Sequence, residues 1–522
     1  MKKTDWFTAG KFRLYFIFLG LLYIISRMYL LTSLPGGYNV DELGIACDSF
    51  SIAADHIDRY GYKMPFYLIN YGGGMSISYT YMTALLISLF GYSKLILRLP
   101  AVIMGLFFSV FSSLSAYELF GSKKAALFTC FLSVIWPVFF MAERFALDSP
   151  LMLYFWSAAL YFLIKGVKSS HAGWYAAAGV FLSAACYSYA LGYVILPFFV
   201  ILVFICLLIS GTGSCVPDRK FIRHFILMGA VTVICVFPLI LMLLINNGYL
   251  PEIRATYFSI PKLPVYRGSE ISPAHIKDNL YLIKDLLTND WLYYSAVPEF
   301  QTMYILSVIL VPMGLVLSIA ETVSSFRRHI FSYVPFILSA FISVSAVIFM
   351  LNEPTVSRSY SIYLSFLFFD TLSVRFIYRK LKKVSIGITA FYAVSAISFF
   401  IFYFSSYNAV YPDVLNFGQP GLGTAIQEFS SSLSSADTIY VDSSKAFSSE
   451  AEIMLYSGSH AYDWNRSEKR IGRYHYDVSA YSGPGAYIAD NRNSPLIASL
   501  KKQDMEKADS CGQYSLYISR KP

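Results

Sequence analysis

Long apolar runs alternate with short polar segments over the first 405 residues of the chain. A run of about 20 apolar residues is long enough to cross a bilayer as a helix. We therefore expect eleven transmembrane helices, at residues 13–32, 97–118, 124–142, 148–165, 173–190, 192–210, 224–246, 301–320, 329–350, 359–376 and 384–405. A further apolar segment, residues 76–91, is interrupted by Ser and Thr, and we expect it to lie in the membrane interface or to dip into the membrane and return.

Clusters of lysine and arginine indicate the topology. They lie at residues 1–13, 123–124, 165–168, 219–223, 327–328 and 375–383. The positive-inside rule places such clusters in the cytoplasm, so an even number of crossings separates the N-terminus from Lys123. Segment 76–91 is therefore expected not to cross. This topology puts the N-terminus inside and five polar features outside, namely residues 33–96, 143–148, 247–300, 351–358 and the region from 406.

Composition agrees with a multi-pass membrane protein, because 56% of the residues are hydrophobic and only 14% are charged. Soluble domains carry about 25% charged residues. The 41 basic residues outnumber the 32 acidic ones, but the excess lies in the clusters between apolar runs. We interpret it as a topology signal rather than as a nucleic-acid surface. The seven cysteines show neither a disulfide framework nor the spacing of a metal site.

The region from residue 406 to the end differs in character. Strand-like segments at residues 438–441, 486–488 and 514–518 alternate with helical ones. We expect residues 406–522 to form a small extracytoplasmic α/β domain that follows an all-α transmembrane domain at residues 1–405.

Asp41 and Glu42 come directly after the first span and open the external loop 33–96. A carboxylate at this surface can act as a general base that removes a proton from an attacking hydroxyl. The alternative is structural, since acidic residues also stabilise the N-terminus of a helix. The residue pattern leaves both interpretations open.

A second polar turn, residues 143–150, contains Glu143, Arg144 and Asp148 between two spans. Capping of the next helix by Asp148 or Ser149 is a sufficient structural explanation for an acid there. A short hairpin has no such need for Arg144, whose planar guanidinium suits a lipid phosphate. Arg358 lies in the external turn 351–358. It either binds a lipid phosphate as well or extends its side chain from a span end to the membrane surface.

External loops and span ends are rich in aromatic residues, among them Tyr187, Tyr189, Tyr293 and Tyr294. Aromatic belts are common at membrane interfaces, and aromatic rings also stack on sugars. A Walker loop, an HExxH motif and a GxSxG elbow are absent from the sequence. Any donor group or energy source must therefore come from outside the chain.

Several of these features occur together and in order. Asp41-Glu42 is followed by Phe90-Gly91, Leu97-Arg98-Leu99-Pro100, Phe120-Gly121, Glu143-Arg144 with Asp148, and the segment 187–193. In this ordered set the chain resembles the GT-C superfamily of integral-membrane glycosyltransferases. The most similar groups are the protein O-mannosyltransferases, the aminoarabinose transferases and the bacterial Rgt-type members. The resemblance covers residues 13–200, weakens through residues 293–304 and Arg358, and is absent from the tail.

The resemblance implies inverting transfer of a sugar from a polyprenyl-phosphate carrier to an acceptor hydroxyl outside the cytoplasm. The acceptor would be a glycan, a lipid or a protein, and the enzyme would lie in a bacterial plasma membrane among membrane lipids. Asp41 matches the catalytic acid of the first loop, Glu42 its neighbour, and Asp148 the second acidic position. The remaining site expectations are donor-phosphate contacts from Arg144, Arg358 and Lys63, and a sugar or acceptor pocket lined by Tyr187, Tyr189, Tyr293 and Tyr294. No cofactor is required by this pattern and no metal ligand set is predicted, although some superfamily members bind a divalent metal.

One departure and several alternatives accompany this interpretation. Aminoarabinose transferases have Lys-Pro-Pro before the interfacial helix, whereas this chain has residues 74–78 without a lysine, so Lys63 or Arg59 would have to substitute. A lipid-linked glycan ligase or polymerase would share the architecture, and a receptor-like scaffold would rest on the tail alone. A transporter would carry ionisable groups deep within spans. We expect Glu118, Glu321 and Asp370 near cytoplasmic span ends instead.

Overall fold

The protein is described by a computed structural model that covers residues 9–70, 72–210, 219–266, 268–288, 295, 297–328, 331–410, 421–434, 436–442 and 449–519. The chain forms two compact units, and each unit is assembled from three separate segments. Unit 1 contains Met1–Tyr29, Ala101–Leu243 and Val265–Ser406, and unit 2 contains Leu30–Pro100, Leu244–Pro264 and Tyr407–Pro522.

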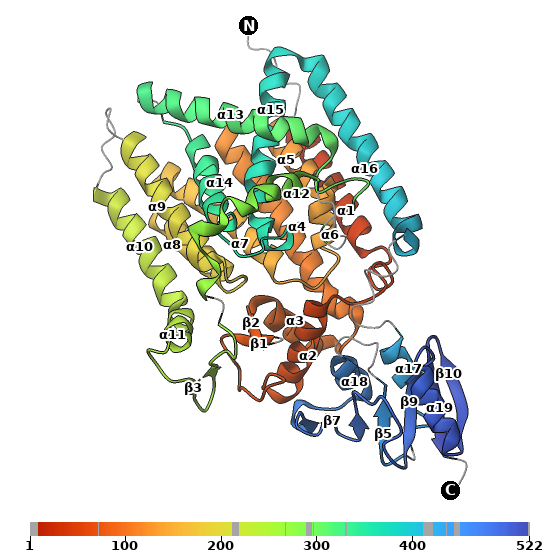
Figure 1. Ribbon diagram of the computed structural model, residues 1–522. Helices are drawn as coiled ribbons and strands as arrows, with labels where there is room; N and C mark the ends of the chain where they lie inside the picture. Colours follow the sequence, from red (N-terminus) through yellow and green to blue (C-terminus); the bar gives the residue numbers. More distant parts are fainter. Residues whose placement is uncertain are drawn as a thin grey trace. The chain divides into compact units, whose positions relative to one another are not determined.

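Unit 1 is built from long helices (Figure 1). The α-helices that lie wholly or partly in it are α1 (Ala9–Met28), α4 (Lys94–Phe120), α5 (Lys123–Ile135), α6 (Pro137–Ala142), α7 (Ser149–Ser169), α8 (Ala172–Cys186), α9 (Gly192–Ser210), α10 (Arg219–Cys235), α11 (Phe237–Asn246), α12 (Leu282–Thr288), α13 (Ile305–Arg328), α14 (Val334–Ile348), α15 (Tyr363–Lys380) and α16 (Lys382–Val410). Short 3₁₀ helices are η1 (Gly268–Glu270), η2 (Pro273–His275), η3 (Asp278–Tyr281) and η4 (Ser357–Ile362).

Small residues let neighbouring helices of this bundle approach closely. A Cβ atom at Gly314 of α13 would collide with the carbonyl oxygen of Phe369 in α15. Gly179 of α8 approaches the carbonyl oxygen of Met228 in α10 in the same way. Such close backbone packing is typical of helix pairs that associate within a membrane.

Six described segments are long and apolar enough to cross a membrane: Lys94–Phe120, Ser149–Ser169, Gly192–Ile209, Ile305–Arg328, Ser357–Lys380 and Lys382–Val410. A seventh is the pair α10 and α11, bent by 57° at the break between them. All eleven expected spans overlap helices, but the other four do not meet these criteria. The helix α1 carries three basic residues, α5 and α6 are separated at Trp136, and α8 and α14 have 15 residues each.

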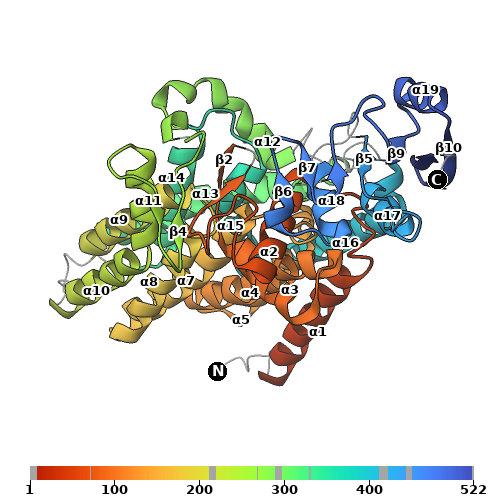
Figure 2. The ribbon, with the colours of Figure 1, turned by 90° about the horizontal axis from the view of Figure 1, so that it is seen from below.

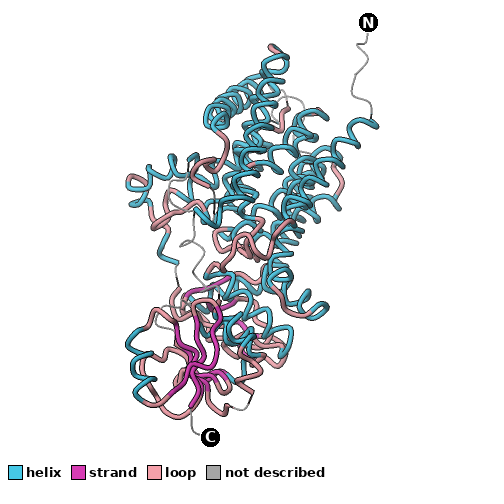
Figure 3. The backbone as a smooth tube through the Cα atoms, turned by 90° about the vertical axis from the view of Figure 1, so that its right-hand side faces the viewer, coloured by secondary structure: helices cyan, strands magenta, loops and turns pink. Residues whose placement is uncertain are grey.

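The C-terminal part of unit 2 contains a mixed sheet, whose strands are magenta in Figure 3. The sheet has seven strands in the order β10-β11-β9-β5-β8-β7-β6. Its strands are β5 (Ile439–Val441), β6 (Trp464–Asn465), β7 (Arg470–Ile471), β8 (Tyr474–His475), β9 (Ala486–Asp490), β10 (Met505–Cys511) and β11 (Tyr514–Ser519). Strand β5 runs parallel to β8 and β9, and the other pairs are antiparallel. The three strand-like segments predicted from the sequence correspond to β5, β9 and β11, so the α/β prediction is confirmed.

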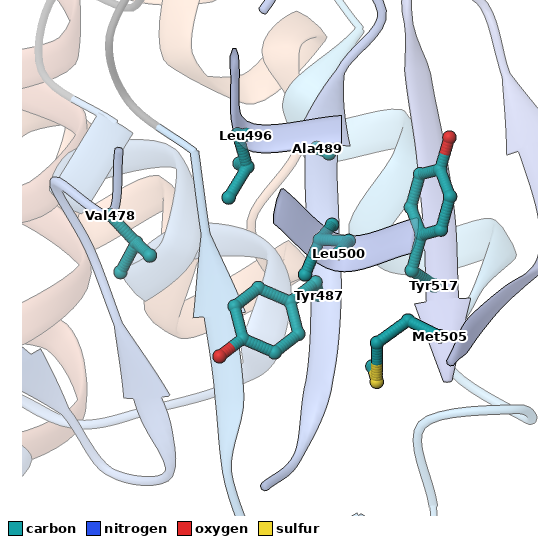
Figure 4. Close-up of a cluster of buried hydrophobic side chains, with 7 residues drawn as sticks. All are labelled: Val478, Tyr487, Ala489, Leu496, Leu500, Met505 and Tyr517. Atoms are coloured by element: carbon teal, nitrogen blue, oxygen red, sulfur yellow. The ribbon is translucent and has the colours of Figure 1, made fainter. Parts of the chain in front are cut away.

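One face of this sheet carries a hydrophobic core. The helix α19 (Ser494–Lys502) contributes Leu496 and Leu500 to it, and the sheet contributes Tyr487 and Tyr517 (Figure 4). All four side chains are almost fully buried. The alternating side-chain directions of β9 and β11 therefore supply an apolar surface that fixes α19.

The remaining part of unit 2 comes from the first loop and its neighbours. It contains α2 (Val40–Asp55), the hairpin of β1 (Leu68–Asn70) and β2 (Gly73–Met75), α3 (Ser78–Phe90) and the pair β3 (Ile253–Arg254) and β4 (Ser259–Ile260). The helix α2 packs against α3 and also against α18 (Ser449–Ser457), which lies beside it in Figures 1 and 2. Two more elements, α17 (Leu422–Glu428) and η6 (Ala461–Asp463), complete the described part of the unit.

Candidate active site

The helix α2 gives Asp41 and Glu42 different surroundings. Asn39 is the N-cap residue, and its side chain accepts a hydrogen bond from the backbone N–H of Asp41 at 2.9 Å. The Glu42 carboxylate accepts from the backbone N–H of Asn39 at 2.9 Å, which completes a capping box. The structural interpretation of the acidic pair therefore applies to Glu42.

Glu42 also forms a buried ion pair. The Arg98 guanidinium donates to both oxygens of the Glu42 carboxylate, at 2.9 and 3.0 Å, and both side chains are fully buried. Arg98 further donates to the carbonyl oxygens of Leu31, Pro35 and Gly37. These contacts tie the start of α2 to the segment before it and to the first turns of α4. They account for Glu42 structurally, and a direct part for it in chemistry stays a prediction.

Asp41, in contrast, is partly exposed. Its Oδ1 atom accepts a hydrogen bond from the Nδ2 amide of Asn70 at 3.1 Å. Asn70 is the last residue of β1, so the hairpin of the first loop reaches the N-terminal turn of α2. This geometry leaves Asp41 as the member of the pair that is both oriented and accessible.

A second carboxylate and an arginine lie behind this contact. Asp48 and Arg59 are buried, and the Arg59 Nε atom lies 3.4 Å from Asp48 Oδ1. Burial raises the pKa of Asp48, and the adjacent Arg59 guanidinium and backbone N–H oppose that rise. Arg59 Nη2 also donates to Asn70 Oδ1 at 2.5 Å. In these contacts the Arg59 guanidinium is directed towards protein groups. That Arg59 takes the place of the missing phosphate-binding lysine stays a prediction.

Asp58 is buried beside this pair. Its Oδ1 atom accepts backbone hydrogen bonds from Tyr60 and Tyr62 at 2.9 and 2.8 Å. Burial, together with the nearby Asp48 carboxylate, raises the pKa of Asp58 to about 7. Asp58 therefore titrates close to neutral pH in the folded protein.

The predicted residues of the turn 143–150 lie in unit 1, where Arg144 caps a helix. Its guanidinium donates to the carbonyl oxygens of Ser26, Arg27 and Tyr29, at 2.9 to 3.0 Å, where α1 ends. It also donates to the hydroxyl of Tyr403 at 3.0 Å. The last carbonyls of a helix lack partners within the helix, and a buried arginine supplies them. The reasoning that the short hairpin gives Arg144 no structural use was wrong, because the need comes from α1.

Its neighbour Glu143 forms a second buried ion pair. Arg27 Nε donates to Glu143 Oε2 at 2.7 Å, and both side chains are fully buried. Gly105 of α4 makes room for this pair, since a Cβ atom there would collide with the Glu143 carboxylate. The contact with donor phosphate expected of Arg144 remains a prediction beside these structural contacts.

Asp148 occupies the N-cap position of α7, but its side chain makes no capping hydrogen bond. Pro150 lies in the first turn of that helix, as predicted. Asp148 thus lies at the capping position that was predicted, but its carboxylate does not cap the helix. The side chain is partly exposed. The role of Asp148 as a second acid stays a prediction.

The other predicted cations lie at the surface of their units. In unit 1, Arg358 Nη1 lies 3.5 Å from Glu270 Oε2 and donates to the carbonyl oxygen of Asn352 at 3.3 Å. In unit 2, Lys63 is exposed. Phosphate binding by Arg358 or Lys63 stays a prediction.

The predicted pocket tyrosines are described only in part. Tyr187 and Tyr189 are partly buried after α8, and the Tyr187 hydroxyl donates to the carbonyl oxygen of Cys235 at 3.0 Å. Tyr293 and Tyr294 lie outside the described residues. Within the described ranges, His, Cys, Asp and Glu side chains form no group of three or more that could hold a metal ion.

The sequence did not predict that Asn70 and Arg59 belong to the Asp41 site. Asn70 has no charge and no recognisable motif, and Arg59 was considered only as a phosphate ligand. Asp370 was misplaced, because it lies within α15, fully buried, and accepts a hydrogen bond from Tyr392 at 2.6 Å. The contacts of Asn70 and Arg59 join residues that are separated in the chain, which spacing does not reveal.

The comparisons with known proteins agree with this fold. The family described as dolichyl-phosphate-mannose-protein mannosyltransferase matches residues 76–242. No curated protein matches the chain by sequence. Apo ArnT from Cupriavidus metallidurans is 13% identical over 98% of both chains, with a TM-score of 0.59. The same enzyme bound to undecaprenyl phosphate gives a TM-score of 0.57 at the same identity and coverage.

An oligosaccharyltransferase from Archaeoglobus fulgidus, tethered to an acceptor peptide, has a TM-score of 0.50. It is 10% identical, and the similarity covers 99% of this chain and 75% of that one. These similarities extend over both the helical bundle and the sheet-containing region of the chain. Residues 76–242 thus match the mannosyltransferase family, and the chain as a whole shares the fold of ArnT.

Proposed function

We propose that the protein is an inverting glycosyltransferase that moves a sugar from a polyprenyl-phosphate carrier to an acceptor hydroxyl on the extracytoplasmic face. The observation that supports this most is the environment of Asp41. Its carboxylate is partly exposed and held by Asn70, whereas Glu42 beside it is fully buried against Arg98. An oriented, accessible carboxylate in the first loop is what a general base requires.

The proposed reaction has one displacement. The acceptor hydroxyl gives its proton to the Asp41 carboxylate as its oxygen attacks the anomeric carbon. The bond between that carbon and the phosphate oxygen breaks, and polyprenyl phosphate leaves with the bonding electrons. Attack from the face opposite the phosphate inverts the anomeric configuration.

The carrier is inferred from similarity. ArnT from Cupriavidus metallidurans binds undecaprenyl phosphate, and the matching family is described by its use of dolichyl-phosphate-mannose. Both are polyprenyl phosphates, so we extend this carrier class to the present chain by analogy of fold. Phosphate contacts from Arg144, Arg358 and Lys63, and an acceptor role for Asp148, are separate proposals on which the base step does not depend.

A transporter is the second candidate, because Asp370 is a fully buried carboxyl group within the candidate span Ser357–Lys380. Ionisable groups within spans often mark a transport pathway. The Asp370 carboxylate, however, accepts a hydrogen bond from the hydroxyl of Tyr392, which also contacts Ser307. These contacts join α15, α16 and α13, so they give Asp370 a packing role. A lipid-linked ligase would differ from the first proposal in using a diphosphate carrier.

The test is release of free polyprenyl phosphate from radiolabelled polyprenyl-phosphate sugars in membranes that contain the protein. Asp41→Asn removes the base and should abolish release, with expression and folding unchanged. Asp55→Asn, at the other end of α2, removes the same charge from a pair with His460 and should retain release. Equal release by the wild type and Asp41→Asn would overturn the assignment of Asp41.

A further inference from the structure

We propose that Asn70 and Arg59 are positioning residues for the Asp41 carboxylate, and that Arg466 of the C-terminal region fixes Arg59. The inference rests on the proposed function of Asp41. All four residues belong to unit 2, although they come from two distant segments of the chain.

The amide of Asn70 is oriented by the charges on its two sides. Its Oδ1 atom accepts from Arg59 Nη2 at 2.5 Å, and its Nδ2 atom donates to Asp41 Oδ1 at 3.1 Å. A guanidinium can only donate and an ionised carboxylate can only accept, so a flipped amide would face repulsion at both ends. The position of Arg59 therefore fixes the orientation of the Asn70 amide, and the amide in turn fixes the Asp41 carboxylate.

The Asn70 amide lies directly on the backbone of α2. A Cβ atom at Gly44, three residues after Asp41, would collide with Asn70 Oδ1 and lie 3.1 Å from Arg59 Nη2. The absence of a side chain at Gly44 is what allows both groups to reach this turn of the helix. Arg59 is held in turn by Asp48, which lies four residues, about one turn, after Gly44 in α2.

Arg466 secures the loop that carries Arg59. Its Nη2 atom donates to the carbonyl oxygen of Arg59 at 2.5 Å. Its guanidinium also lies over the rings of Tyr60 and Trp464, 4.3 and 4.0 Å from their centroids. Such a cation between two rings and a carbonyl acceptor has a defined position. The C-terminal region thereby contributes a fixed point to the site around Asp41.

The test compares kcat and KM for sugar transfer. Asn70→Asp keeps the shape and the acceptor towards Arg59 but, when ionised, cannot donate to Asp41. We expect kcat to fall about 10- to 100-fold, the usual cost of a misplaced catalytic group, with little change in KM. Gly44→Ala displaces the Asn70 amide without removing a polar group, and it should likewise lower kcat with little change in KM. Arg466→Gln should lower kcat several-fold, whereas Lys469→Gln in the same hairpin, whose exposed Lys469 pairs with Asp477, should not.

The outcomes separate this inference from the proposed function. If Asp41→Asn is inactive while Asn70→Asp and Gly44→Ala keep the wild-type kcat, the positioning inference is overturned and the base assignment stands. If Asp41→Asn is fully active, the proposed function itself fails. Thermal unfolding in detergent identifies variants that do not fold, and Asn70→Ser, a smaller polar side chain, then replaces Asn70→Asp in the comparison.

A different observation in unit 1 supports a second inference. A groove of about 820 Å³ runs between α1, α5, α15 and α16. Most of its lining is apolar, with Phe18, Leu22 and Phe131 along its length. The cations that line it, Lys124, Arg375 and Arg379, lie in the first turn of α5 and the last turns of α15. The groove is thus apolar along its length and basic at one end.

We infer that this groove binds an anionic glycerophospholipid, with an acyl chain in the apolar part and the phosphate at the basic end. Arg375 is held by the carbonyl oxygen of Phe120 at 2.9 Å, and Lys124 by the hydroxyl of Tyr378 at 2.6 Å. Basic pockets between transmembrane helices are suited to lipid head groups of this charge. The charge of the lining therefore selects an anionic lipid over a zwitterionic one.

Native mass spectrometry of the purified protein tests this inference with phosphatidylglycerol and phosphatidylcholine as probes. The wild type should retain phosphatidylglycerol preferentially, and Lys124→Gln/Arg379→Gln should lose that preference. Arg327→Gln/Arg328→Gln, which removes two exposed cations at the end of α13, serves as the matched control and should keep it. Equal retention of phosphatidylglycerol by all three proteins, or equal retention of both lipids by the wild type, would overturn the inference.

Discussion

Asp41 and Glu42 are adjacent in the chain, yet α2 turns one towards solvent and the other towards Arg98. The sequence predicted an acidic pair with a catalytic or a structural use, and the structure associates the structural use with Glu42. Spacing alone could not make this assignment. Arg98 is 56 residues from Glu42 in the chain, and Asn70 is 29 residues from Asp41.

Removal of the Glu42 charge should destabilise the protein. In Glu42→Gln, Arg98 stays buried without its charged partner, and loss of one member of such a pair costs about 3–5 kcal/mol. We expect a clear fall in the unfolding temperature in detergent. Glu42→Gln/Arg98→Met removes both charges and should recover part of the loss. An unfolding temperature equal to that of the wild type in Glu42→Gln would contradict a stabilising ion pair.

Asp58 should make stability depend on pH. Its pKa in the folded protein is about 7, whereas an unfolded Asp titrates near pH ~4. Between these values the folded state binds a proton that the unfolded chain has released, so stability falls as the pH rises. Asp58→Asn, whose Oδ1 atom can still accept from Tyr60 and Tyr62, removes that fall.

The measurement is the unfolding temperature at pH 5 and pH 8. Asp58→Asn should exceed the wild type at pH 8, and the difference should shrink towards pH 5. Asp55→Asn, the same change of an acid to its amide in α2, should keep the pH dependence of the wild type. The same dependence in Asp58→Asn would show that Asp58 does not cause it.

Among the elements, the spans were the most predictable and their breaks the least. Every expected span overlaps a helix because a long apolar run in a membrane has few other conformations. The breaks before Pro137 and near Pro238 were not predicted, although proline removes a backbone donor and disfavours a continuous helix. In the C-terminal region the apolar strands β5, β9 and β11 were predicted, whereas β10, with Glu, Lys and Asp along it, gave no strand pattern.

The helix α3 gives a test of topology at this scale. Its 13 residues span about 20 Å, less than the ~30 Å hydrocarbon core of a bilayer. If α3 does not cross, Lys63 and Lys123 lie on opposite sides of the membrane. In a background without cysteines, Lys63→Cys should react with an impermeant maleimide in intact cells, and Lys123→Cys only after permeabilisation. Reaction of both in intact cells would indicate that α3 crosses.

At the scale of the whole molecule, unit 2 joins three segments that are far apart in the sequence. The sequence predicted the C-terminal α/β region as a separate domain, because its composition changes at residue 406. It could not predict that α18 packs on α2, since that contact joins residues about 400 positions apart and leaves no periodic pattern. The Tyr38 and Tyr456 hydroxyls, 2.7 Å apart, belong to the same interface.

Cys47 reports on that interface. Its thiol is fully buried in α2 and donates to the carbonyl oxygen of Ala451 in α18 at 3.6 Å. Burial raises the pKa of Cys47, and a buried protonated thiol reacts slowly with maleimides. In the native protein Cys47 should therefore remain unlabelled.

Ala451→Asp places an uncompensated charge in the interface between α2 and α18, where Ala451 is buried. Because an unpaired charge is costly in such a place, we expect α18 to separate from α2 and Cys47 to become reactive. Ala498→Asp, on the exposed face of α19, adds the same charge and should leave Cys47 protected. Mass spectrometry of the peptide that contains Cys47 measures the labelling. If Cys47 of the wild type is labelled as fully as that of Ala451→Asp, α18 does not cover α2 in solution, and the C-terminal region does not hold the helix that carries Asp41.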